Sequence, residues 1–130
     1  MADQKYFRVI DANLNRAREG LRVIEDSARF VLKKEGAYKE ARSLRHRLDG
    51  ITRGIYPELL KQRDAASDAG RKIKEGGRDG FGSVISANFR RVEESLRVLE
   101  EYAKFISPGA APAFKSIRFK AYSLEKKILV

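Results

Sequence analysis

The sequence predicts an all-α protein, a four-helix bundle built from two duplicated helical hairpins related by a pseudo-two-fold axis. Residues 8–30 and 83–105 repeat each other, with 12 identities in 23 positions at a constant offset of 75. Apolar residues recur every three or four positions in four segments, which is the spacing of helices that bury one face. No segment alternates polar and apolar residues with period two over a useful length, so we expect no sheet.

The first repeat, about residues 6–55, is expected to hold two helices. The first of these carries an apolar stripe at near-heptad spacing, made of Ile10, Leu14, Ala17, Leu21, Ile24, Ala28 and Val31. Gly36 then marks the end of this helix, and a second stripe follows over residues 37–55. Two helices of this kind bury their stripes most completely by packing together with a second hairpin.

A linker over residues 56–82 is expected to join the two repeats. Residues 57–60, Pro-Glu-Leu-Leu, suit a short helical turn, whereas residues 62–82 hold five glycines and almost no apolar side chains. A loop of this length inside a compact domain is usually functional or disordered. The second repeat, about residues 83–130, again has two apolar stripes, and Pro112 lies where a first helical residue should be. We therefore expect a single domain over residues 1–130.

The composition limits the classes of function. The chain has 28 basic and 18 acidic residues, a net charge of +10, and no cysteine. The basic excess lies in the middle and at the C-terminus, which favours an anionic partner such as a phosphorylated metabolite or nucleic acid; a solvated basic surface is the alternative. With His46 as the single histidine, a His-rich metal site is disfavoured. The N-terminus lacks an apolar signal region and no long apolar run occurs, so we expect a cytoplasmic protein without a membrane partner.

The repeat duplicates polar residues as well as apolar ones. Three polar positions step around each first helix beside its apolar stripe: Asn13, Arg16 and Glu19, then Asn88, Arg91 and Glu94. If the two first helices pack together, these six residues line one crevice. Because an arginine without a specific partner is costly to desolvate, Arg16 and Arg91 are predicted to bind an anion there. For Arg22 with Glu25 and Arg97 with Glu100, ordinary i,i+3 ion pairs are favoured instead.

Closely spaced carboxylates in the linker indicate a magnesium site. Asp64 and Asp68 lie between Arg63 and Gly70, and two such carboxylates can hold Mg²⁺ while waters and phosphates complete the octahedron. An ordinary solvated turn is the alternative, because spacing alone does not separate the two.

The predicted second helices share a Ser-x-Arg pattern that ends at Arg45 and at Arg118. On the last helix, Lys115, Arg118 and Tyr122 lie on one face, since they are three and four residues apart. A phosphate contact at this face and a packed tyrosine beside a solvated lysine are the two interpretations.

Four segments carry a family resemblance: ANLNRAREGLRVIEDSARF, ANFRRVEESLRVLEEYAKF, the RD-x-x-x-D-x-G run of the linker, and FKSIRFKAYSLE near the end. Over about residues 6–128, the chain resembles the small hydroxymethylpyrimidine-phosphate kinases of thiamine biosynthesis, which occur alone or fused N-terminally to thiamine-phosphate synthase. The resemblance implies ATP-dependent phosphorylation of 4-amino-5-hydroxymethyl-2-methylpyrimidine phosphate to its diphosphate. It therefore implies ATP and Mg²⁺ as cofactors and a phosphorylated pyrimidine as substrate.

Within this interpretation the candidate residues fall into three sets. The catalytic cations, which would absorb the charge that develops on the phosphates, are Arg16, Arg91 and Arg63. The substrate- and phosphate-binding set is Asn13, Asn88, Arg45, Arg118, Lys115 and Gly70. The metal-binding set is Glu19, Glu94, Asp64 and Asp68.

Two other functions stay open at this point. The chain could be a non-catalytic helical partner or N-terminal-type domain of a thiamine-phosphate synthase, whose basic surface binds the enzyme or captures its substrate. A nucleic-acid-binding bundle is disfavoured, because the interleaved exposed aromatics of single-strand binders are lacking. Apolar positions off the main stripes, such as Val9, Val23 and Phe30, leave a homodimer open.

Overall fold

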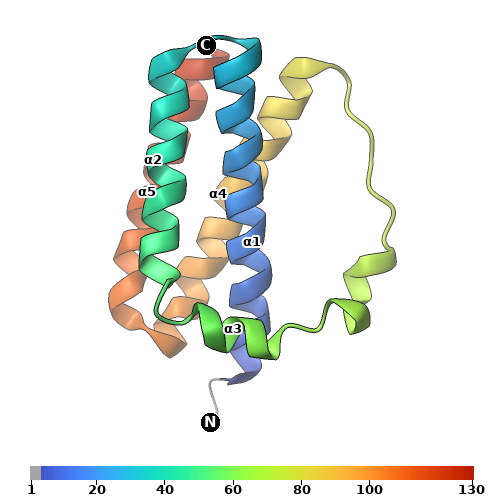
Figure 1. Cartoon of the computed structure of the whole chain (residues 1–130), viewed down its shortest axis with the longest axis vertical. Helices are drawn as coiled ribbons and strands as arrows, with labels where there is room; N and C mark the ends of the chain where they lie inside the picture. Colours follow the sequence, from blue (N-terminus) through green and yellow to red (C-terminus); the bar gives the residue numbers. More distant parts are fainter. Residues whose placement is uncertain (1–3) are drawn as a thin grey trace.

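The computed structural model describes residues 4–130, and its regular elements are all helical (Figure 1). The four long helices are α1 (Gln4–Asp26), α2 (Glu35–Thr52), α4 (Phe81–Ile106) and α5 (Ala111–Leu129), and α3 (Tyr56–Gln62) is a short one. No strand occurs within residues 4–130. The predicted all-α class is confirmed. Residues 4–130 also contain no helix that is long and apolar enough to cross a membrane.

The long helices lie side by side around one core (Figure 1). Helix α1 packs most extensively against α4, α4 packs against α5, α1 against α2, and α2 against α5. The predicted stripes supply the buried side chains, the largest of which include Leu14, Leu21, Leu48, Phe89, Leu96 and Ile117. Burial of these side chains is the main stabilising contribution to the fold.

Helices α1 and α4 come unusually close together at Gly20. A Cβ atom at this position would lie 2.7 Å from Cγ2 of Val92 and 3.2 Å from the backbone oxygen of Asn88. The equivalent residue of the second repeat is Ser95, which is also small and buried. The two helices that carry the repeat therefore meet across small residues, which fixes their separation.

The first apolar stripe ends earlier than its spacing predicts. Helix α1 passes into a π-helical turn, Ser27–Val31, and there Val31 is 60% exposed. One turn of i→i+5 bonds advances the register, so the last stripe position rotates away from the core. Lys33, with a φ of 54°, then reverses the chain before α2.

The connecting segments agree with the predicted linker. Residues 57–60 lie in α3, which buries Leu59 against α1. Two short 3₁₀ turns follow, Ala65–Ser67 and Ala69–Lys72, and every residue from 63 to 80 is exposed. This segment runs outside the bundle before it returns to the start of α4 (Figure 1). Gly80, the N-cap of α4, has a φ of 108°, a conformation that favours glycine.

Candidate functional site

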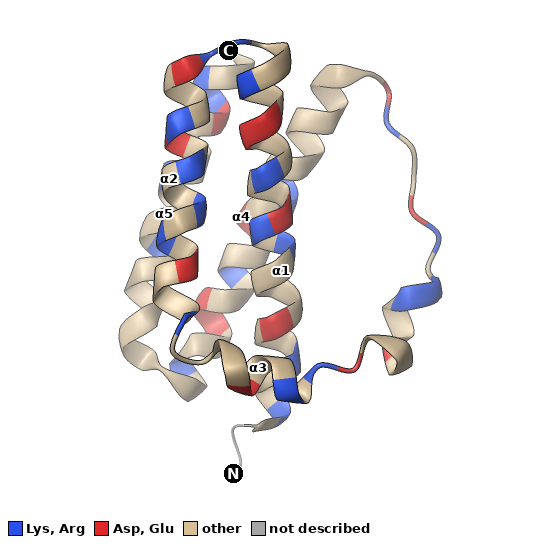
Figure 2. Ribbon diagram, viewed as in Figure 1, with Lys and Arg blue, Asp and Glu red and all other residues tan. Residues whose placement is uncertain are grey.

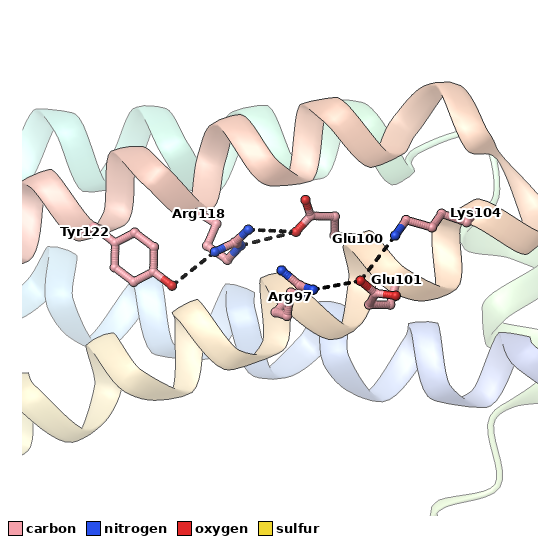
Figure 3. Close-up of polar contacts among 6 residues, drawn as sticks. All are labelled: Arg97, Glu100, Glu101, Lys104, Arg118 and Tyr122. Atoms are coloured by element: carbon pink, nitrogen blue, oxygen red, sulfur yellow. Dashed lines mark hydrogen bonds and ion pairs between the residues drawn. The ribbon is translucent and has the colours of Figure 1, made fainter.

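Two equivalent ion pairs each join the two long helices of one hairpin, α1 to α2 and α4 to α5. Glu25 Oε2 lies 2.8 Å from Nε of Arg45, and Glu100 Oε2 lies 3.0 Å from Nη2 of Arg118 (Figure 3). The glutamates are 75 residues apart, and the arginines are the ends of the two Ser-x-Arg patterns. Each pair is largely removed from solvent, where a carboxylate without its cation would be costly.

The two arginines of these ion pairs, Arg45 and Arg118, belong to the predicted substrate-binding set. The hydrogen bond that Arg45 donates to Glu25 raises the pKa of Arg45, and the hydrogen bonds that Arg118 donates to Tyr122 and then to Glu100 raise the pKa of Arg118. Both guanidinium groups are therefore bound by groups of the protein itself. Their role in binding a substrate stays a prediction.

Of the two i,i+3 ion pairs expected within the first helices, Arg22–Glu25 forms and Arg97–Glu100 does not. Arg97 pairs with Glu101 at 3.0 Å, so the predicted Arg97–Glu100 pair is wrong (Figure 3). Arg22 lies 3.7 Å from Glu25, a looser contact than that of Arg45. Glu25 and Glu100 instead find their closest partners on the neighbouring helix, because both carboxylates point into the seam between helices.

Each of the two duplicated asparagines forms a hydrogen bond within its own helix. Nδ2 of Asn13 donates to the carbonyl of Val9 at 2.9 Å, and Nδ2 of Asn88 donates to the carbonyl of Val84 at 2.8 Å. Arg16 Nη1 then donates to Oδ1 of Asn13 at 3.3 Å. The matched asparagines thus satisfy buried or half-buried polar groups within each first helix.

The charged members of the predicted crevice lie at the surface. Arg16 and Glu19 are exposed on α1, and Arg91 and Glu94 are exposed on α4. Glu94 lines the groove between α4 and α5. A single phosphate-binding crevice that contains all of these residues stays a prediction.

The structure brings the predicted linker residues together against α1. Nε and Nη2 of Arg63 donate to the two carboxylate oxygens of Asp11 at 2.8 and 2.7 Å, and Nη2 of Arg8 donates to the backbone oxygen of Asp64 at 3.2 Å. The hydrogen bond with Asp11 is the main cause that raises the pKa of Arg63. A cavity of about 160 Å³ lies here, and Asp68 and Asn15 also line it.

Asp11 is a site residue that sequence reasoning missed. It is buried in α1, and its equivalent in the second repeat is Ser86. That difference was the available signal, because a charged residue at a buried position of one repeat alone needs a partner outside the repeat.

Of the predicted metal ligands, Asp64 and Asp68 accept hydrogen bonds from the linker backbone, and Glu19 lies at a distance from them on α1. Asp64 Oδ1 accepts the N–H of Ser67 at 3.2 Å, and Asp68 Oδ1 accepts the N–H of Gly70 at 2.7 Å, as in ordinary capped turns. Glu19 lies eight residues beyond Asp11 on α1, about 12 Å along the helix. Across residues 4–130, no group of three or more His, Cys, Asp or Glu side chains could hold a metal ion. Magnesium binding stays a prediction.

A groove of about 440 Å³ lies between α4 and α5. Its lining residues are mostly charged: Arg90, Glu93, Glu94, Arg97, Arg118 and Tyr122. The predicted Lys115 is exposed elsewhere on α5, 5.9 Å from the ring of Phe119.

Glu93 is the residue of this groove that sequence reasoning missed. It is 8% exposed, and its Oε2 has no hydrogen-bond partner among residues 4–130. Burial, and then the neighbouring carboxyl of Glu125, raise the pKa of Glu93 to about 8. The signal was again a mismatch of the repeat, since Arg18 is the equivalent residue.

The first half has a corresponding groove of about 400 Å³ between α1 and α2, and Tyr56 and Pro57 of α3 also line it. Arg18 lines it, and its Nε lies 2.8 Å from Oδ1 of Asp49. Arg18, the repeat equivalent of Glu93, therefore has the opposite charge of Asp49 beside it.

Comparison with known proteins identifies the family. The model of the ThiD2 family matches residues 8–127. The chain belongs to the ThiD2 family. It is 43% identical over 129 residues to a thiamine-phosphate synthase of Nostoc punctiforme, a match that covers 97% of this chain and 36% of the relative.

Two further relatives have the same proportions. Thiamine-phosphate synthases of Gloeobacter violaceus and Synechocystis sp. are 40% and 39% identical, over 95% and 94% of this chain and 36% of each relative. The chain thus spans about a third of the length of the curated relatives it matches. No solved structure matches.

These comparisons correct the predicted activity. The relatives are named for a synthase and not for a kinase, so the prediction that this ThiD2 chain is a hydroxymethylpyrimidine-phosphate kinase is contradicted and is withdrawn. The link of the family to thiamine biosynthesis, which the resemblance also implied, is supported by the same names. Binding of ATP and of a phosphorylated pyrimidine stays a prediction.

Proposed function

We propose that this chain is the helical companion domain of a thiamine-phosphate synthase and that it docks on the catalytic part of that enzyme. The observation that carries the proposal is the match over 97% of this chain to a synthase of which it makes up 36%. A segment that accounts for one third of a synthase, and has its own core, is a module with a working relation to the other two thirds.

An exposed aromatic cluster supplies a docking point. The ring of Phe105 stacks on that of Tyr6 with centroids 4.8 Å apart, and Tyr102 lies 5.8 Å from Tyr6. Phe105 is nevertheless 57% exposed. Aromatic side chains that are held in place by neighbours but open to solvent are typical anchors of protein interfaces, since little side-chain entropy is lost on binding.

The charge distribution supports an anionic partner or an anionic substrate. Lysine and arginine residues recur along the helices and along the linker (Figure 2). With a net charge of +10, the chain attracts an acidic protein surface or a phosphorylated molecule over long range. The same surface would hold a phosphorylated substrate close to the synthase.

Co-elution with the thiamine-phosphate synthase of the same organism tests the docking role. We expect the two purified proteins to elute as one complex in size-exclusion chromatography. Phe105→Ser should weaken the complex by about thirtyfold in Kd, the loss of one aromatic anchor. Phe30→Ser is the matched control, because Phe30 is the repeat equivalent of Phe105, is exposed to a similar extent and lies at the other end of the bundle, away from the Tyr6 cluster.

Two results would overturn the proposal. One is separate elution of both proteins at concentrations of tens of micromolar (a weak complex would still shift). The other is product formed from ATP and the pyrimidine monophosphate by this chain alone, which would make it an enzyme in its own right.

A further inference from the structure

Helices α2 and α5 carry two adjoining cavities that are lined mostly by basic side chains. The cavities measure about 410 and 270 Å³ and share Ser43 and Arg47. Within residues 4–130, the charged side chains that line them are one carboxylate and five cations: Glu40, Lys39, Arg42, Arg47, Lys120 and Lys127. The three grooves described above each contain both arginines and carboxylates. The surface around these two cavities, here called the α2–α5 face, therefore has a large unbalanced positive charge.

Part of this charge is neutralised within the protein. Nζ of Lys127 lies 2.6 Å from Oε1 of Glu40. Nζ of Lys39 lies 2.9 Å from Oε1 of Glu35. The cations of the face that form no ion pair with any of residues 4–130 are Arg42, Arg47 and Lys120. These unpaired cations gain most from an incoming anion, because no carboxylate already offsets their charge.

The face also offers hydroxyl groups and an apolar contact. Nη2 of Arg47 donates to Oγ of Ser116 at 3.4 Å, which holds the guanidinium between α2 and α5. Leu44 lines the smaller cavity beside Ser43 and Ser123. Separated cations around hydroxyls and an aliphatic side chain are complementary to a protein segment that carries both carboxylates and an aliphatic side chain.

The spacing and the lining favour such a segment over a phosphate ligand or a nucleic acid. Arg42 and Arg47 are five residues apart, about 7.5 Å along α2, which suits separate carboxylates better than one phosphate group. Within residues 4–130, no aromatic side chain lines either cavity, so nucleic-acid bases would have no ring on which to stack. An unbroken row of phosphates, about 3.4 Å apart along a strand, would also pass close to the carboxylate of Glu40.

From these features we infer that the α2–α5 face binds an acidic segment of a partner protein, in which carboxylates flank an aliphatic side chain. The carboxylates pair with Arg42, Arg47 and Lys120, and the aliphatic side chain packs against Leu44. Because α1 packs against α2 and α4, and α5 packs against the same two helices, this face lies across the bundle from the aromatic cluster at Phe105 on α1 and α4. It is a second interface, and it does not depend on docking to the synthase through that cluster.

A labelled peptide tests this interface on the full chain. The probe is a glutamate-rich peptide with one central leucine, and its two controls have glutamine in place of every glutamate or serine in place of the leucine. We expect fluorescence anisotropy to show saturable binding of the probe at low salt, which weakens as salt screens the ion pairs. The serine peptide should bind about threefold more weakly, since one apolar contact is lost. The glutamine peptide should not bind.

Two lysines of α5 separate recognition by this face from the general attraction of a basic protein. Lys120→Glu and Lys126→Glu change the net charge equally, and both lysines are exposed, but only Lys120 lines the face. We expect Lys120→Glu to weaken probe binding about fivefold, whereas Lys126→Glu should weaken it by less than about twofold. Adding Arg42→Glu to Lys120→Glu should raise the loss to about twenty-fivefold, because independent effects multiply. Circular dichroism checks that each variant is folded, as expected for exposed positions.

Four outcomes would overturn the inference. Equal weakening by Lys120→Glu and Lys126→Glu would mean that net charge alone attracts the probe, and equal binding of the leucine and serine peptides would remove the apolar contact. Tighter binding of a single-stranded oligonucleotide or of inorganic pyrophosphate than of the probe would assign the face to a phosphate ligand. The fourth outcome is no binding of the probe at low salt. Phe105→Ser should leave probe binding unchanged, so this test and the co-elution with the synthase fail independently.

Discussion

Arg18 on α1 and Glu93 on α4 occupy equivalent positions of the repeat, yet their surroundings differ. Arg18 has the carboxylate of Asp49 at 2.8 Å, whereas Glu93 has a second carboxyl, that of Glu125, beside it. The frame around them is nearly the same, because each half also contains a glutamate–arginine pair between its two helices. Positions that match between the halves therefore build the scaffold, and positions that differ give each half its own groove.

The largest effect on stability is expected from the two equivalent glutamate–arginine ion pairs, one in each half. Arg118→Ala would leave Glu100 buried without its cation, and Arg45→Ala would do the same to Glu25. We expect each variant to lose about 3 kcal/mol of unfolding free energy, measured by urea denaturation. Arg42→Ala, at an exposed position of the same charge, should change it by less than about 0.5 kcal/mol. A large loss in one half alone would show that the pairs are not equivalent.

The contact between α1 and α4 gives the next largest effect. Gly20→Ala would place a Cβ 2.7 Å from Val92 and 3.2 Å from a backbone oxygen, so the helices must shift. We expect a loss of about 2 kcal/mol in spite of the better helix propensity of alanine. Ser95→Ala is the matched change in the other repeat, and it should stay within about 0.5 kcal/mol. Equal values for the two variants would contradict the close approach at Gly20.

Glu93, in the groove between α4 and α5, predicts a pH dependence that the first half lacks. The pKa of Glu93 is about 8 in the folded protein against an ordinary value of 4.5. Below pH 4.5 the carboxyl is protonated in both states. Between pH 4.5 and 8 only the unfolded chain releases the proton, so the unfolding free energy falls as the pH rises.

Glu93→Gln should remove this dependence and make the protein more stable at pH 8 by at least about 1 kcal/mol relative to its difference at pH 4.5. Chemical denaturation at the two pH values measures the change. Glu94→Gln, at the exposed neighbouring position, is the control and should keep the original slope. The idea fails if the slope persists in Glu93→Gln.

The smallest effect belongs to the ion pair of the first half. Asp49→Asn removes the charge that faces Arg18, but both side chains are about one-third exposed and solvent screens the pair. We expect a loss of no more than about 1 kcal/mol, and less in 1 M salt. A loss as large as that of Arg118→Ala would mean that the Arg18 pair belongs to the buried frame.

Most of the fold could be predicted from the sequence. The apolar stripes predicted the long helices. Pro112 lies in the first turn of α5 and residues 57–60 lie in α3, as their residue types indicated. Periodicity is a local property, so it is readable along the chain. The π-helical turn at Ser27–Val31 was missed, because tertiary packing and not local pattern decides where the register of α1 changes.

The candidate site was predictable only in part. The linker residues Arg63, Asp64 and Asp68 do lie together, but their partner Asp11 is 52 residues from Arg63 and was missed. For Arg45 and Arg118, residue type suggested an anion, and the anion the structure supplies is a carboxylate of the protein.

The sequence by itself determined the helices, the repeat and the family, since each is written in local spacing or in residue identity. Only the tertiary structure decided which polar side chains find a partner within the protein and which do not. Arg45 and Arg118 are bound by glutamates of another helix, while the acceptor of Glu93 has no partner among residues 4–130. The physical reason is that the energy of a charge depends on its burial and on its neighbours in space, and spacing along one helix specifies neither.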